Sequence, residues 1–132
     1  MLITQPTVFA LYAALNGLIL LFLGIMVTRQ RVKTETVILD AGKEEMIRAV
    51  RAHANAAEYI PIVLLLLAAM AWLQAPIWLM HLVGILLTLG RILHAVGLSR
   101  SSGRTTERFI GTNLTWIALL IGCVATLIYA LR

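Results

Sequence analysis

Four long apolar segments constrain this chain more than any other feature of its sequence. They cover about residues 7–28, 42–73, 76–97 and 106–131. A helix of about 20 residues crosses the hydrocarbon core of a bilayer, so each segment is long enough to span it once. Only 13% of the 132 residues are charged, against about 25% in a typical soluble domain. The sequence therefore predicts one all-α domain over residues 1–132, an integral membrane four-helix bundle.

The lysine and arginine residues lie almost entirely in two loops and the adjoining segment ends, about residues 29–43 and 98–106. The turn at 74–76 has none, and the C-terminus carries only Arg132. Because loops rich in Lys and Arg stay on the cytoplasmic side, both charged loops are expected in the cytoplasm. The formal net charge of +5 does not indicate a nucleic-acid partner, since no basic run is interleaved with exposed aromatic residues.

The second segment carries a polar face. Arg48, Arg51, Asn55 and Glu58 fall within a narrow arc at 100° per residue. Counting back about 20 residues from Leu73 places Asn55 and Glu58 at membrane depth, where polar groups mark a functional site. Such a face suits a small ligand with carboxylates and an amine, because arginine binds carboxylates and Glu58 accepts from an ammonium. Ion pairs between Arg51 and acidic residues of the same helix, at the membrane surface, are the alternative interpretation.

The other segments hold isolated polar residues. Arg91 lies well inside an apolar run, so it requires a carboxylate partner or a polar cavity. Glu58 is the only acidic residue at comparable depth. We expect His81 to be a hydrogen-bonded or interfacial histidine, and Asn16 to serve helix packing rather than ligand binding.

Two blocks of the sequence resemble a known family. Residues 51–61, with the sequence RAHANAAEYIP, resemble the second-helix signature of the MAPEG family, the membrane-associated proteins of eicosanoid and glutathione metabolism. Residues 90–97, GRILHAVG, resemble the third helix of that family. Microsomal glutathione transferases, leukotriene C synthases and prostaglandin E synthases are members. The resemblance implies a homotrimer that binds glutathione as co-substrate, together with membrane lipid and a lipophilic small-molecule substrate.

The expected glutathione-binding residues come from this resemblance and from the polar helix faces. They are Arg29, Arg31, Arg48, Arg51, His53, Asn55, Glu58, Tyr59, Arg91, His94 and Thr112. Among them, Arg51, Asn55, Glu58 and Tyr59 match family positions that bind glutathione. By resemblance, His53 and His94 occupy positions that bind it through polar side chains, and Arg29 or Arg31 matches an arginine that reaches the same pocket.

Catalysis in this family requires the thiolate of glutathione, because the neutral thiol is a poor nucleophile. The family arginine that stabilises it lies at or near the start of the fourth helix. Here the resemblance favours Arg108, with Arg104 as the second choice because loop lengths differ among relatives. Thr105 or Thr106 is expected to cap that helix. No metal is expected, and the single cysteine, Cys123, excludes a cysteine-based metal site.

Departures from the family pattern leave several functions open. Leu98 stands where relatives often have a tyrosine, and Phe109 and Thr112 replace a serine and a tyrosine of one branch. The leading hypothesis is a glutathione transferase or peroxidase for lipophilic electrophiles in a bacterial inner membrane. The first alternative is a non-catalytic lipid-binding or scaffold member of the family. A small four-helix transporter is disfavoured, because Glu58 lies near the cytoplasmic side among arginines.

Overall fold

The computed structural model describes residues 4–132, which form four long helices. These are α1 (Gln5–Thr34), α2 (Glu44–Trp72), α3 (Ile77–Arg100) and α4 (Thr106–Ala130). Each is long and apolar enough to cross a membrane, and residues 4–132 contain no strand. The predicted all-α class and the four membrane-spanning helices are therefore confirmed.

Helix α1 continues about six residues beyond its predicted end near residue 28. Arg31 and Lys33 lie in its last turn, where positive side chains interact favourably with the helix dipole. A count of apolar residues finds only the part of a helix that lies in hydrocarbon, so it misses such an extension.

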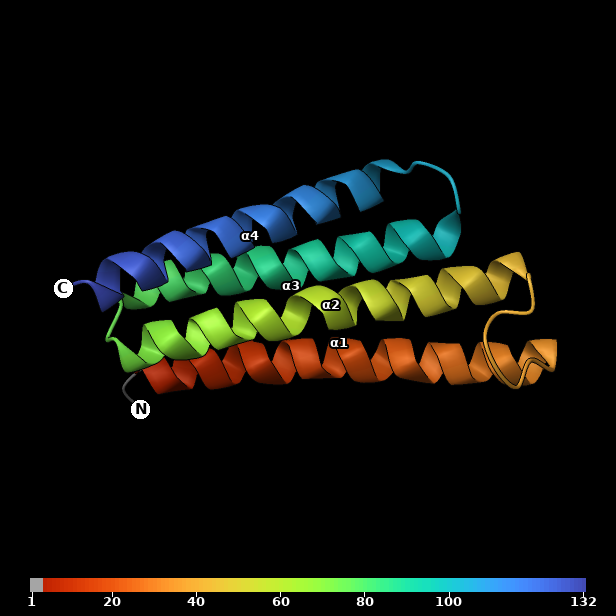
Figure 1. Cartoon of the computed structure of the whole chain (residues 1–132), viewed down its shortest axis with the longest axis horizontal. Helices are drawn as coiled ribbons and strands as arrows, with labels where there is room; N and C mark the ends of the chain where they lie inside the picture. Colours follow the sequence, from red (N-terminus) through yellow and green to blue (C-terminus); the bar gives the residue numbers. More distant parts are fainter. Residues whose placement is uncertain (1–3) are drawn as a thin grey trace.

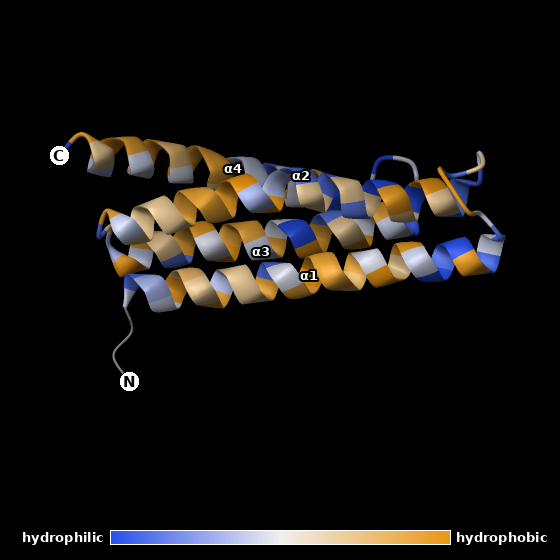
Figure 2. Ribbon diagram, turned by 60° about the horizontal axis from the view of Figure 1, so that its bottom comes forward, coloured by the Kyte–Doolittle hydropathy of each residue, from blue (hydrophilic) through white to orange (hydrophobic). Residues whose placement is uncertain are grey.

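The central pair of helices is α2 and α3, with α1 and α4 on opposite flanks (Figure 1). Each flanking helix packs on both central helices, and within residues 4–132 α1 and α4 do not contact each other. The α1–α2 and α3–α4 loops lie at one end of the bundle, which we call the loop end, while the α2–α3 turn and the C-terminus lie at the other (Figure 1). Hydrophilic residues gather toward the loop end (Figure 2).

Helices α3 and α4 cross closely because glycines line their contact. A Cβ atom at Gly90 would lie 2.6 Å from Thr115 Oγ1 and 2.9 Å from the carbonyl oxygen of Gly111. A Cβ atom at Gly111 would collide with the backbone of His94. This close approach places Thr115 of α4 against α3 and brings the start of α4 next to His94.

A polar contact between α1 and α3 lies nearer the other end. The Tyr12 hydroxyl is 2.9 Å from His81 Nδ1, and the Tyr12 ring covers Gly84. Asn16 Nδ2 donates to the Tyr12 carbonyl at 2.9 Å and to Thr88 Oγ1 at 3.0 Å. Both expectations hold: His81 is hydrogen-bonded, and Asn16 is a buried packing residue.

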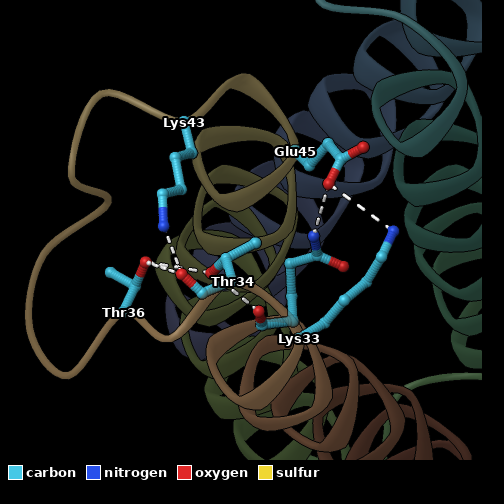
Figure 3. A network of polar contacts seen from close by, with 6 residues as sticks. Lys33, Thr34, Thr36, Lys43 and Glu45 are labelled. Carbon is cyan, nitrogen blue, oxygen red and sulfur yellow. Dashed lines mark hydrogen bonds and ion pairs between the residues drawn. The ribbon is translucent and has the colours of Figure 1, made fainter.

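The α1–α2 loop is tied to the helices on either side of it (Figure 3). Lys43 Nζ donates to the carbonyl oxygen of Thr34, and Thr36 Oγ1 donates to the same oxygen at 3.2 Å. Lys33 Nζ lies 3.6 Å from Glu45 Oε2, which links the end of α1 to the start of α2. These contacts give the loop a defined conformation at the loop end.

Candidate glutathione site

A basic cavity of about 180 Å³ opens at the loop end between α2, α3 and α4. Its lining brings together five of the residues expected from the sequence: Arg48, Arg51, Asn55, His94 and Arg108. Ile47, Leu98 and Ser102 complete the lining, which contains no carboxylate. Three guanidinium groups from two helices therefore face one small space.

Two of these guanidinium groups are free of ion pairs. The third, Arg48, is ion-paired: its Nη1 lies 3.1 Å from Glu44 Oε1. The Ser102 hydroxyl donates a hydrogen bond to the same Glu44 oxygen at 2.5 Å. Within the described part of the chain, neither Arg51 nor Arg108 forms an ion pair, so the intrahelical pairing considered for Arg51 is not made. Arginine forks without a carboxylate partner favour binding of an anion.

Arg91 is buried, with 2% of its surface exposed, and does not line the cavity. Its Nη1 donates to Asn55 Oδ1 at 2.7 Å, and its Nε and Nη2 donate to Thr115 Oγ1 at 2.9 and 2.6 Å. Of the two surroundings expected for Arg91, a carboxylate partner or a polar cavity, the structure shows polar surroundings, because Glu58 is exposed and neutral acceptors bind the guanidinium. The Tyr59 ring, with its centroid 5.3 Å from Arg91 Cζ, adds a cation–π contact.

Arg91 also fixes the orientation of Asn55. A guanidinium can only donate hydrogen bonds, so the side-chain oxygen of Asn55 must face it. Asn55 Nδ2 then points away, toward Glu58 Oε2 at 3.5 Å. Asn55 therefore presents a donor, not an acceptor, on the side away from Arg91.

Tyr59 lies beside the cavity without lining it. Its hydroxyl accepts a hydrogen bond from Trp116 Nε1 at 3.2 Å. The ring is thus held between Arg91 of α3 and Trp116 of α4. Tyr59 supports the site through these contacts, and Glu58 lies one position earlier, exposed on α2.

A second, larger groove of about 650 Å³ runs along the start of α4. Arg104 and Thr112 line it, together with the aromatic side chains of Phe109 and Trp116. Arg108 lines both this groove and the basic cavity. Thr105 caps α4, its hydroxyl accepting from the backbone N–H of Arg108 at 3.3 Å, as one of the two expected caps.

The remaining expected residues lie on the α1 side of the protomer. Arg31 donates to loop carbonyl oxygens, and Arg29 is exposed on α1. His53 faces α1, with its Nε2 3.7 Å from the point where a Gly24 Cβ would lie. The fold of the single chain does not bring these three residues to the basic cavity.

Sequence reasoning missed Ser102 in the cavity and the role of Thr115 as an Arg91 acceptor. Ser102 lies in a loop, where no periodicity indicates direction. Thr115 had a usable signal, because it shares a face of α4 with Arg108 and Thr112 at helical spacing.

The helices and the basic cavity define an integral membrane protein with a cluster of arginines at one end of its bundle. Residues 9–128 match the model of the MAPEG family. The inner membrane protein YecN of Escherichia coli K12 is 38% identical over 120 residues, covering 91% of this chain and 90% of that protein. The protein of the same name from E. coli O6:H1 matches equally. The chain belongs to the MAPEG family.

Proposed function

We propose that this protein is a membrane-bound glutathione transferase or peroxidase that acts on lipophilic electrophiles. Family membership supports glutathione as the co-substrate. The observation that carries the proposal is the basic cavity, in which Arg48, Arg51 and Arg108 face a space without a carboxylate in its lining. An anion bound there gains charge-assisted hydrogen bonds from up to three guanidinium groups.

Glutathione has two carboxylates, one ammonium and a thiol, and the residues around the cavity match these groups. In this proposal Arg48 and Arg51 bind the carboxylates, and Asn55 donates a hydrogen bond to the ligand. Glu58, beside Asn55, is the acidic group available to an ammonium. This assignment places the thiol near Arg108, where the cavity meets the groove on α4.

Arg108 activates the thiol in this proposal. A free thiol has a pKa near 8.5, and lowering it by about two units takes about 2.7 kcal/mol of preferential thiolate stabilisation. A guanidinium in a site with little water is strong enough to supply this. The sulfur then attacks the electrophilic carbon of a molecule in the groove. The leaving group departs with the bonding electron pair, and the thiol proton goes to solvent.

The active assembly is proposed to be a homotrimer. His53 and Arg31 lie on the α1 side, whereas Arg108 lies on the α4 side, and α1 and α4 do not touch within residues 4–132. In a ring, the α1 side of one subunit meets the α4 side of the next. Such a ring brings His53 and Arg31 of one subunit close to Arg108 of its neighbour. Native mass measurement in mild detergent tests it: a monomer that still binds glutathione tightly would overturn the assembly.

We place the protein in a bacterial inner membrane with both charged loops in the cytoplasm. The similar E. coli protein is named an inner membrane protein, and the loop end carries most of the Lys and Arg. This orientation opens the basic cavity to the compartment in which glutathione is abundant.

Calorimetric titration with glutathione, followed by turnover with a generic aryl halide, tests the function. Arg51→Gln should weaken binding by about 10-fold or more, the usual effect of losing a charged hydrogen-bond partner. Arg132→Gln is the matched control, because Arg132 lies at the opposite end against Tyr129. Wild-type protein that binds no glutathione would refute the proposal.

One observation favours a second candidate, a non-catalytic family member that binds glutathione or lipid. Leu98 lines the basic cavity where relatives often have a tyrosine, so the lining lacks an aromatic hydroxyl near the sulfur. Glutathione binding without turnover of any electrophile would support this candidate over the enzyme.

A further inference from the structure

Three large aliphatic side chains stand out from the α1–α2 loop. Val37, Ile38 and Leu39 are 93%, 75% and 76% exposed, although the helices around them pack normally. A contiguous apolar cluster of this exposure is unfavourable in water and marks an interaction surface.

One arginine of α1 binds three carbonyl oxygens of the segment beneath this cluster. Arg31 Nη1 donates to the carbonyl oxygens of Thr36, Val37 and Leu39 at 3.5, 3.3 and 3.1 Å. The loop folds back beside the last turns of α1 (Figure 1). Arg31 thereby satisfies three carbonyl oxygens of the loop tip, which lowers the free-energy cost of moving them out of water.

The loop also has the right depth. The apolar part of α1, about residues 8–27, spans about 30 Å, the thickness of the hydrocarbon core. Arg31 lies four residues further on, about 6 Å beyond that boundary, in the layer of lipid headgroups. Exposed aliphatic residues of α1, such as Met26 and Val32, lead from the lipid-facing surface to the loop, so the apolar cluster continues that surface.

The backbone of Leu39 adopts a left-handed conformation, with φ of 55°. Glycine or asparagine usually occupies such positions in loops exposed to water. A leucine held there with its side chain exposed indicates that the apolar side chain itself has a role.

We infer that Val37, Ile38 and Leu39 insert into the lipid headgroup layer and anchor the α1–α2 loop to the membrane surface. The inference is independent of glutathione. The charges of residues 29–45 balance, with Arg29, Arg31, Lys33 and Lys43 against Glu35, Asp40, Glu44 and Glu45. The contact is therefore apolar, and insertion requires no anionic lipid.

Spin labels report the depth of the loop in nanodiscs of phosphatidylcholine alone. In a Cys123→Ala background, a label at Ile38→Cys is compared with Leu21→Cys, exposed on mid-α1, and Gly103→Cys, exposed in the α3–α4 loop. The ratio of collisions with oxygen to collisions with a water-soluble nickel chelate should be several-fold higher at Ile38 than at Gly103. It should lie below the value at Leu21.

Equal ratios at Ile38 and Gly103 would place the loop in water and overturn the inference. An immobile Ile38 label that neither reagent reaches would show that a second copy of the chain covers the loop, which also overturns it. Arg31→Gln, combined with Ile38→Cys, should lower the ratio toward that of Gly103 without changing helical content. An unchanged ratio would overturn the role assigned to Arg31.

Discussion

Arg108 connects the basic cavity with the groove on α4, so its substitution should separate binding from chemistry. Arg108→Ala should raise the pKa of the bound thiol, because the cation stabilises thiolate more than thiol. Turnover should fall by about 10²–10³-fold, the usual loss for one electrostatic donor. The absorbance of the thiolate near 240 nm, followed against pH in the bound state, measures the thiol pKa.

Arg104→Ala is the matched control for Arg108→Ala. Arg104 is exposed and lines only the groove, so its loss should leave the thiol titration unchanged. If the titration shifts with Arg104→Ala and not with Arg108→Ala, the catalytic role belongs to Arg104. If neither variant shifts the thiol titration, the result favours the non-catalytic family member over the enzyme.

Arg91 should influence glutathione only through Asn55, because it is buried and absent from the cavity lining. Arg91→Leu frees the Asn55 amide to rotate, and we expect glutathione affinity to fall by about 10- to 100-fold. The double-mutant cycle is decisive, because coupled residues are not additive. Added to Asn55→Ala, Arg91→Leu should weaken binding no further; an additive loss would contradict the positioning role.

The partner of Arg91 shows what the sequence leaves open at this scale. The sequence identified a buried arginine in need of acceptors, and that much was correct. Its acceptors lie 36 residues earlier, at Asn55, and 24 residues later, at Thr115. An acidic residue can be proposed as the partner of an arginine from the sequence alone. Neutral acceptors are too common for that, and they become identifiable only once the packing of the helices is known.

The crossing of α3 and α4 depends on its glycines. Gly111→Ala would place a methyl group against the backbone of His94, and such overpacking costs about 1–3 kcal/mol. Gly17→Ala is the control, since nothing lies within 4 Å of a Cβ there and alanine favours a helix by about 1 kcal/mol. Thermal unfolding followed by circular dichroism should show Gly111→Ala destabilised and Gly17→Ala not; equal midpoints would contradict the packing argument.

Each helix was predictable because hydrocarbon imposes a minimum apolar length. The distances between the helices were not predictable. Small residues are common in membrane helices, and their positions in the sequence do not indicate which neighbouring helix they contact. Gly90 and Gly111 meet each other, while Gly17 faces outward.

The orientation of the whole protein is testable with impermeant thiol reagents on intact cells. In a Cys123→Ala background, Lys33→Cys and Ser102→Cys should be protected, because both belong to the loop end that we place in the cytoplasm. Leu131→Cys, at the opposite end, should be labelled. The reverse pattern would invert the topology, and labelling of all three after permeabilisation verifies that each site is reactive.

The sequence predicted five of the eight residues that line the basic cavity. Arg48, Arg51 and Asn55 share one helix face, so periodicity alone groups them, and the family resemblance added His94 and Arg108. Other expected residues do not line the cavity, and His53 is an example, because the resemblance assigns it to the same ligand while helical geometry turns it toward α1. In the proposed trimer His53 would serve a neighbouring subunit, and such a role cannot be recognised from one chain.

Arg108 borders two spaces that open in different directions, and this has a kinetic consequence for the proposed reaction. The basic cavity faces the loop end, whereas the groove on α4 runs along the flank of the bundle. A water-soluble reactant and a membrane-dissolved one therefore reach the same guanidinium by separate routes, and neither blocks the other. If the proposed reaction takes place there, we expect a random-order ternary complex, in which high concentrations of one reactant do not inhibit binding of the second.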